Sequence, residues 1–127
     1  MNRTDDILVV DDEANIVDLI AEVLIEEGYG VRRAYDGASA LAAIVANPPA
    51  LILLDMAMPD MIGTTLIQRI RQNQIRYIPV IIMTAGAYST ATLMAQGAAD
   101  YLPKPFEIDT LLDCVARCLQ PQQSRAS

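Results

Sequence analysis

The chain contains no histidine, no tryptophan and a single lysine, Lys104, among its 127 residues. Without histidine it cannot form a Ser-His-Asp triad, a zinc site with histidine ligands or a phosphohistidine of its own. Positive charge is scarce, with 9 Lys and Arg against 16 Asp and Glu and a formal net charge of −7. Because nucleic acid binding takes clustered positive charge, we expect no direct nucleic acid binding by this domain.

The chain also has few cysteines and no long apolar run. Only Cys114 and Cys118 occur, too few for a disulfide framework, and we expect both to be reduced and half-buried. The most apolar stretches, 51–54 and 78–83, are far shorter than the ~20 residues that cross a bilayer. Residues 1–6 turn acidic before any apolar run, unlike a signal peptide, so we expect a cytoplasmic protein without membrane contact.

What the sequence does contain is a regular alternation of apolar runs and helical patterns, with an apolar content of 53%. The length suits one domain with its own core. The expected strands are 7–10, 29–34, 51–54, 80–83 and 100–102, and the expected helices are 14–27, 36–47, a segment ending near 73, 90–96 and 108–119. Asp36 is suited to cap the second helix. Strands separated by helices predict an α/β fold, a doubly wound parallel sheet between two helical layers.

Polar side chains follow the predicted strands at their carboxyl ends. They are Asp11-Asp12, Asp55, Thr84 and Lys104. In open parallel sheets ligands bind outside this edge, so we expect these side chains to converge. Three carboxylates repel one another and need a cation. Mg²⁺, with Mn²⁺ as a substitute, takes such oxygen ligands, so the sequence predicts a metal site here.

This set of charges suits a phosphoryl group. Formally, Mg²⁺ and Lys104 balance the three carboxylates, so the site can accept incoming negative charge. Asp55 would attack phosphorus and form an acyl phosphate, while Thr84 and Lys104 would bind the phosphate oxygens. Taken singly, each of these residues has a simpler interpretation as a helix cap, a turn, a strand or a solvated loop residue. Their joint occurrence at four strand ends favours the functional interpretation.

Four motifs occupy these strand ends in a specific order and spacing. They are Val9-Val10-Asp11-Asp12-Glu13, Leu53-Leu54-Asp55-Met56-Ala57-Met58-Pro59, Met83-Thr84-Ala85 and Asp100-Tyr101-Leu102-Pro103-Lys104-Pro105-Phe106. Together they resemble the receiver domain of two-component response regulators. The resemblance covers residues 6–119 and implies a three-layer, flavodoxin-like receiver fold with strand order 2-1-3-4-5. We expect a receiver domain over residues 1–119 and a polar tail, or the start of a linker, at 120–127.

The resemblance implies roles in metal binding and phosphoryl transfer. Asp55 would be the phosphoacceptor. Asp12 would bind the metal directly, Asp11 mainly through water, and the backbone carbonyl of Ala57 would be a further ligand. Ala57 and Gly86 are small where the family tunes hydrolysis of the acyl phosphate, so we expect partners to set the phosphate lifetime.

The resemblance also implies a switch. The phosphate contacts would be the side chains of Thr84 and Lys104 and the backbone of Met56 and Ala85, beside a cis peptide bond at Lys104-Pro105. Tyr101 would turn inward when Thr84 is drawn to the phosphate, which would change the surface of residues 90–119.

The partners follow from the absence of histidine. The phosphodonor would be a histidine kinase or a histidine phosphotransfer protein, and the domain would catalyse only its own phosphorylation and dephosphorylation. The phosphorylated form would act on an effector or on an output domain of a longer protein. A phosphorylation-dependent homodimer through the last two helices is compatible with the sequence, although we expect Asp113 and Arg117, four apart, to pair within their own helix.

Three other functions are less compatible with the sequence. An aspartate-nucleophile phosphohydrolase would place a second aspartate where Ala57 stands, and would need a cap domain for which this length leaves no room. A flavin-binding domain would cradle a phosphate in the first loop, whereas residues 11–13 are acidic. The main alternative is a docking module of the same fold that works without phosphorylation.

Overall fold

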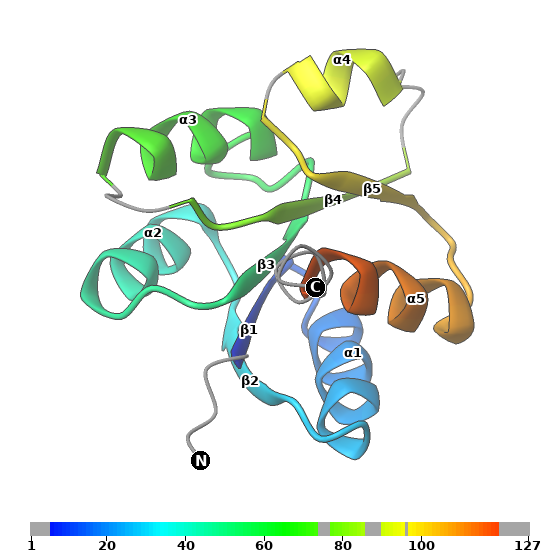
Figure 1. The fold of residues 1–127 in the computed structure, drawn as a ribbon. Coiled ribbons are helices and arrows are strands. Elements are labelled where there is room, and N and C mark those ends of the chain that lie inside the picture. Colours follow the sequence, from blue (N-terminus) through cyan, green and yellow to red (C-terminus); the bar gives the residue numbers. More distant parts are fainter. Residues whose placement is uncertain (1–5, 74–76, 86–89, 96, 120–127) are drawn as a thin grey trace, which may run out of the picture.

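The computed structural model describes residues 6–73, 77–85, 90–95 and 97–119, and the expected tail at 120–127 lies outside this set. Strands and helices alternate along the chain, as predicted (Figure 1). The strands are β1 (Asp6–Val10), β2 (Gly30–Ala34), β3 (Leu51–Asp55), β4 (Val80–Thr84) and β5 (Asp100–Pro103). The helices are α1 (Ala14–Glu26), α2 (Gly37–Ala46), α3 (Gly63–Asn73), α4 (Thr90–Ala95) and α5 (Ile108–Leu119). Among the described helices, none is long and apolar enough to cross a membrane.

The strands form one parallel sheet in the order β2-β1-β3-β4-β5, which confirms the predicted topology. β1 lies inside the sheet, where Leu8 is opposite Arg32 of β2 and Ile52 of β3. Residues 7–10, 51–54 and 80–83 have 0% exposed surface. Helices cover both faces of these strands, which is why each of them is a continuous apolar run.

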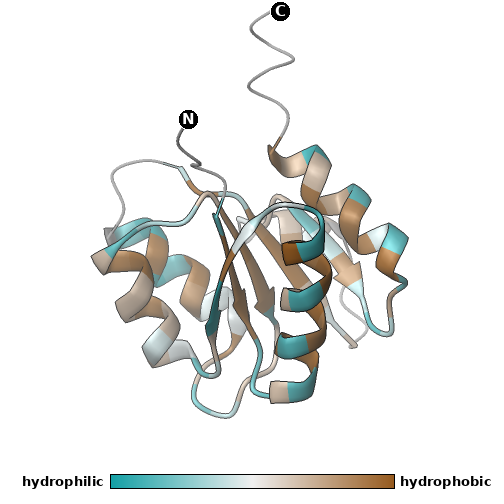
Figure 2. Cartoon of the chain, turned by 90° about the horizontal axis from the view of Figure 1, so that it is seen from below, coloured by the Kyte–Doolittle hydropathy of each residue, from teal (hydrophilic) through white to brown (hydrophobic). Residues whose placement is uncertain are grey.

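Two hydrophobic clusters lie on opposite faces of the sheet. Ile7 and Val9 pack with α1 and α5, whereas Leu8 and Val10 pack with α2, α3 and α4, as the alternation of side chains along a strand requires. Figure 1 shows these helices on the two sides of the sheet, and Figure 2 shows apolar strands enclosed between helices. The packed core thus fixes where the carboxyl ends of the strands lie.

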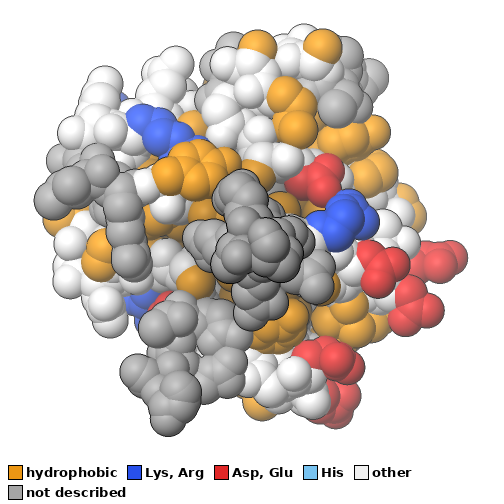
Figure 3. Space-filling model, in the orientation of Figure 1, with side chains coloured by type: hydrophobic (Ala, Val, Ile, Leu, Met, Phe, Trp, Pro, Cys, Tyr) orange, Lys and Arg blue, Asp and Glu red, His pale blue; other side chains and the backbone are white. Residues whose placement is uncertain are grey.

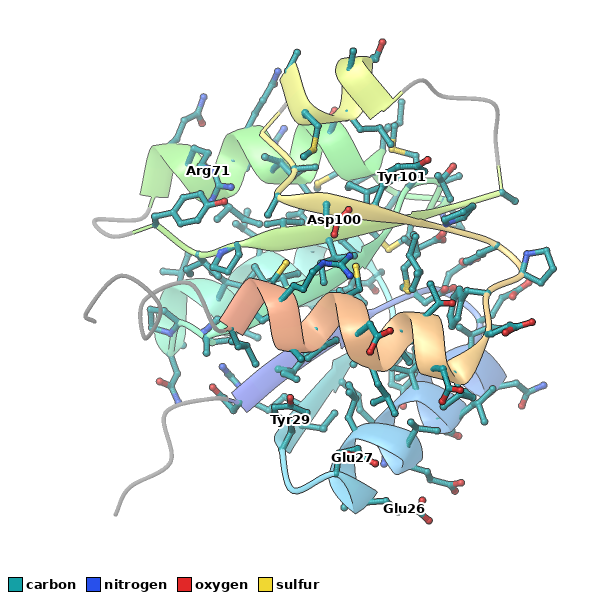
Figure 4. All side chains as sticks on the ribbon, turned by 45° about the vertical axis from the view of Figure 1, so that its right-hand side comes forward. Glu26, Glu27, Tyr29, Arg71, Asp100 and Tyr101 are labelled. Atoms are coloured by element: carbon teal, nitrogen blue, oxygen red, sulfur yellow. The ribbon has the colours of Figure 1, made fainter. Side chains whose placement is uncertain are left out.

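Arg71 of α3 connects three segments on one face of the sheet (Figure 4). Its guanidinium donates to the carbonyls of Ile78 and Gly97, both at 3.0 Å. It also lies over the Tyr77 ring, 4.8 Å from the centroid. These carbonyls belong to the segment before β4 and to the turn after α4, so one side chain joins α3 to both.

The expected pairing of Arg117 with Asp113 is wrong. Arg117 instead donates to Asp100 Oδ2 at 2.9 Å, across from α5 to the start of β5 (Figure 4). The Asp100 carboxylate is already oriented by hydrogen bonds from the Tyr101 N–H at 2.8 Å and the Cys114 thiol at 3.3 Å. A half-buried acceptor that is fixed in this way is a better partner than an exposed, mobile side chain one helical turn away. Both cysteines are free thiols, as expected, but only Cys118 is half-buried, because Cys114 packs inside the cluster between the sheet and α5.

Candidate functional site

The carboxyl ends of four strands meet at one pocket of about 420 Å³. Asp12 follows β1, β3 and β4 end in Asp55 and Thr84, and Lys104 follows β5. The pocket is lined by Asp12, Glu13, Asp55, Met56, Ala57, Thr84, Ala85 and Lys104. Asp11 is fully buried and does not line the pocket. The structure therefore brings together the side chains that the sequence singled out.

Three carboxylates and one ammonium group make up the centre of the site. One oxygen from each of Asp11, Asp12 and Asp55 lies within 4.8 Å of the others. Lys104 Nζ donates to Asp11 Oδ2 at 3.0 Å and to Asp55 Oδ1 at 3.1 Å. The other oxygen of Asp11 accepts the Glu13 N–H at 3.0 Å, so both of its oxygens are engaged. Formally, these four side chains leave a net charge of −2.

The pKa values of the ion pair reflect this crowding. Burial raises the pKa of Asp55, and the hydrogen bond from Lys104, which acts in the opposite direction, does not outweigh burial together with the charge of Asp11. Burial lowers the pKa of Lys104, but its hydrogen bonds to Asp11 and Asp55 outweigh this effect, so the pKa is raised. Lys104 therefore stays charged at neutral pH, and a second cation would relieve the repulsion among the carboxylates.

The donor set fits a hard divalent cation. Carboxylate and carbonyl oxygens are the ligands that Mg²⁺ prefers, and the ion usually keeps several waters, for which the pocket has room. Asp12 is exposed, and the backbone of Ala57 lines the same pocket. Figure 3 shows acidic side chains gathered on the side of the molecule where α1 and α5 lie. A surface with charge of one sign raises the local concentration of counter-ions, here cations.

The backbone of Met56, an expected phosphate contact, is engaged in other hydrogen bonds in this structure. The Met56 N–H donates to the carbonyl of Met83 at 2.9 Å, because the β3–β4 ladder continues one residue beyond β3. The Met56 carbonyl accepts the Gly63 N–H at 2.7 Å, so both backbone groups of Met56 have partners within the protein. Ala57 and Ala85 also line the pocket, and their N–H groups have no hydrogen-bond partner among the described residues. Of these two N–H groups the sequence singled out that of Ala85, whereas it assigned Ala57 only through its carbonyl.

The strands β4 and β5 are tied together beside the pocket. Thr84 is buried, and its carbonyl accepts the Lys104 N–H at 2.8 Å. The peptide bond that follows, Lys104-Pro105, is cis. Tyr101 is half-buried and packs on the cluster shared by α2, α3 and α4, on the opposite face of β5 from Asp100 (Figure 4). Gly86 lies outside the described residues.

Two more residues at this edge were not predicted. Glu13 lines the pocket, and its position beside Asp12 was a signal that could have identified it. Asp60, in the β3–α3 loop (residues 56–62), accepts the N–H groups of Gly37 and Ala38 at 3.0 and 3.1 Å. No local pattern connects Asp60 with residues more than twenty positions earlier in the chain.

The fold and the site together define a class of protein. A doubly wound sheet with an acidic cluster and a lysine at its carboxyl edge is the arrangement expected of a receiver domain. The comparison with protein families agrees, because the family described as "Response regulator receiver domain" matches residues 7–116. The chain belongs to this family, the receiver domains of two-component response regulators.

Individual relatives support the same family. The chain is 38% identical over 120 residues to "Response regulator ArlR" of Staphylococcus saprophyticus. This alignment covers 93% of this chain and 54% of ArlR. It is also 38% identical over 119 residues to "DNA-binding transcriptional regulator NtrC" of Escherichia coli, and this alignment covers 92% of this chain and 25% of NtrC. The signal receiver domain of the putative Luxo repressor protein from Vibrio parahaemolyticus matches with a TM-score of 0.89 and 31% identity over 98% of this chain and 96% of that one. The chain thus spans about half the length of ArlR and a quarter of NtrC.

Proposed function

We propose that this domain accepts a phosphoryl group on Asp55 from a phosphohistidine of a partner protein. The observation that carries the proposal is that three carboxylates, those of Asp11, Asp12 and Asp55, lie close together beside Lys104 at one pocket. Like charges gathered at one edge destabilise the fold unless a cation joins them, so stability alone does not account for the arrangement. A site that binds a divalent cation and a phosphoryl group does account for it.

The transfer exchanges one bond to phosphorus for another. An oxygen of Asp55 attacks phosphorus while the bond to the imidazole nitrogen of the donor breaks, and the imidazole leaves with the bonding electron pair. The product is an acyl phosphate on Asp55. Mg²⁺ bound by Asp12, Asp55 and the carbonyl of Ala57, with Asp11 acting mainly through water, would neutralise charge on the transferring group.

The switch would begin at the same atoms. When Asp55 carries a phosphoryl group, Lys104 can exchange its bond to the Asp55 carboxylate for one to a phosphate oxygen. The Thr84 hydroxyl and the Ala85 N–H would bind further phosphate oxygens. A shift of Thr84 toward the phosphate would let Tyr101 turn inward and change the surface formed by α4, β5 and α5, which is a population shift between two packings.

The partners are proposed on chemical grounds. The donor would be a histidine kinase or a histidine phosphotransfer protein, because the chain has no histidine. The domain, placed at residues 1–119 and in the cytoplasm, would catalyse only its own phosphorylation and dephosphorylation. Its readout would be an effector or an output domain, as the DNA-binding regulator NtrC suggests, or a homodimer through α4 and α5. We expect these partners to set the lifetime of the phosphate.

Phosphorylation by acetyl phosphate in the presence of Mg²⁺ tests the proposal. We expect a slower band on a phosphate-affinity gel for the wild type, and none with EDTA or with Asp55→Asn. Lys104→Arg should still accept phosphate but should lose phosphorylation-dependent partner binding, because a guanidinium fork does not replace a point charge shared by two groups. A wild-type protein that binds its partner but never forms the Asp55 adduct would favour the alternative, a docking module that works without phosphorylation.

A further inference from the structure

The β3–α3 loop is attached to the start of α2 by contacts that have no evident part in the phosphoryl chemistry. We propose that Asp60 is a positioning residue, which anchors this loop on α2 and thereby fixes the backbone of Ala57 at the metal site. The inference rests on the proposed function, since it concerns the same Mg²⁺ site. It extends that function to a residue outside the pocket, because Asp60 does not line it.

The anchor is a pair of hydrogen bonds to a helix N-terminus. Asp60 Oδ1 accepts the Gly37 N–H at 3.0 Å, and Asp60 Oδ2 accepts the Ala38 N–H at 3.1 Å. The first N–H groups of a helix have no partner inside it, and the aligned peptide dipoles favour a carboxylate there. Asp60 therefore satisfies two donors of α2 with one side chain and holds the loop at that distance.

An apolar contact beside these bonds makes the attachment close. Gly37 is buried, and a Cβ at this position would lie 2.8 Å from the Met61 Cβ. Only glycine leaves room for Met61 at that distance. Asp60 and Met61 thus press the tip of the loop onto the first residue of α2, and neither contact depends on the three acidic side chains of the site.

The loop is short enough to transmit this attachment to Ala57. Ala57 forms an isolated antiparallel bridge with Ile62, and Gly63 N–H donates to the Met56 carbonyl at 2.7 Å. A Cβ at Gly63 would lie 3.1 Å from the Asp55 carbonyl oxygen, so the base of the loop is packed against the phosphoacceptor backbone. A loop fixed at its base and at its tip has little freedom to move Ala57 relative to Asp12 and Asp55.

Asp36 supplies a matched control. Its carboxylate accepts the Ser39 N–H of the same helix at 2.8 Å, but Asp36 precedes α2 and makes no contact with the β3–α3 loop among its recorded hydrogen bonds. Asp36→Ala and Asp60→Ala each remove one negative charge and one cap from α2. Only Asp60→Ala also releases the loop.

The test is a Mg²⁺ titration of the wild type and both variants, followed by the backbone amide shifts of Asp12 and Ala57. Outer-shell residues that orient ligands typically change metal affinity by ten- to a hundredfold, so we expect Asp60→Ala to raise the Kd for Mg²⁺ about tenfold. The Ala57 amide should also shift in the metal-free spectrum. Asp36→Ala should bind Mg²⁺ like the wild type although it destabilises the same helix.

The outcomes separate this inference from the proposed function. If the wild type binds Mg²⁺ and Asp60→Ala binds it equally well, the anchoring role is refuted while the metal site stands. Equal weakening in Asp36→Ala and Asp60→Ala would also refute it, because the effect would then come from charge or from α2 as a whole. A wild type that does not bind Mg²⁺ would overturn the proposed function itself.

Discussion

Replacing Asp55 by asparagine should stabilise the metal-free protein. Oxygens of Asp55 and Asp11 lie within 4.8 Å, where two like charges repel by about 3 kcal/mol at an effective dielectric constant near ~20. On the same scale Lys104 Nζ, 3.1 Å from Asp55, contributes about 5 kcal/mol of attraction. Asp12 adds a weaker, solvent-screened repulsion, and burial of the Asp55 carboxylate is also unfavourable. The pKa of Asp55 is raised, so burial and the neighbouring carboxylates together outweigh the attraction of Lys104 for the charged form.

Because these opposing effects largely cancel, we expect a gain of about 1 kcal/mol in the free energy of unfolding, the usual size of a single-substitution effect. The amide oxygen of asparagine can still accept the Lys104 hydrogen bond, so the substitution removes charge and keeps the contact. In saturating Mg²⁺ the order should reverse. A ligand at a hundred times its Kd stabilises the folded state by about 2.7 kcal/mol, and the variant, with one carboxylate fewer, binds the ion less tightly.

Urea unfolding followed by circular dichroism, in EDTA and then in Mg²⁺, measures both effects. A carboxyl whose folded pKa is raised binds more protons in the folded state, so the contribution of Asp55 to wild-type stability should rise as the pH falls through that raised pKa. Asp55→Asn should lack this rise. Asp100→Asn is the control of opposite sign. Burial raises the pKa of Asp100, but hydrogen bonds from Arg117, Tyr101 and Cys114 outweigh this effect, so the pKa is lowered. The Asp100→Asn variant should therefore be less stable than the wild type. A metal-free Asp55→Asn less stable than the wild type would refute the reasoning.

Two further predictions concern residues away from the pocket. Arg71→Lys should lower stability by about 1 to 2 kcal/mol in urea unfolding, because two different guanidinium nitrogens, Nη1 and Nη2, donate to the two carbonyls at 3.0 Å each and one ammonium nitrogen cannot take both places; wild-type stability in this variant would contradict the assignment. Burial, with the neighbouring Asp100 carboxylate, raises the pKa of the Cys114 thiol to about 12, so alkylation of the native protein should be far slower than that of the urea-unfolded chain; rapid native labelling would show that the thiol is accessible and ionised.

The fold was predictable because its signals are local. Each central strand is an apolar run buried on both faces, and such runs separated by amphipathic helices allow few arrangements other than a parallel sheet. The helix cap at Asp36 was equally visible, since its partner Ser39 is three residues away. The convergence of Asp12, Asp55 and Lys104 followed from the rule that strand ends share an edge.

The contacts that could not be predicted depend on how separate elements approach one another. The Met56 N–H donates to the Met83 carbonyl because the β3–β4 ladder extends one residue beyond β3, and no residue type in the sequence indicates this extension. Arg117 pairs with Asp100 because β5 presents a carboxylate that is already oriented, and helical spacing alone favoured Asp113. The anchor at Asp60 depends on a loop and a helix that are neighbours only after folding.

The single lysine of the chain, Lys104, occupies a position that an arginine would not fill in the same way. Eight of the nine basic residues are arginines, and among the described ones Arg32, Arg33 and Arg117 each form an ion pair with one aspartate. Lys104 differs because one nitrogen contacts carboxylates from two strands, at 3.0 and 3.1 Å. An ammonium places its charge on one nitrogen that can sit between two nearby acceptors and move to a third, whereas a guanidinium spreads its donors over separate nitrogens in a rigid plane. In the proposed function Lys104 exchanges a carboxylate for a phosphate oxygen, which needs the former property, so the one lysine of the chain lies at the position where an ammonium is required.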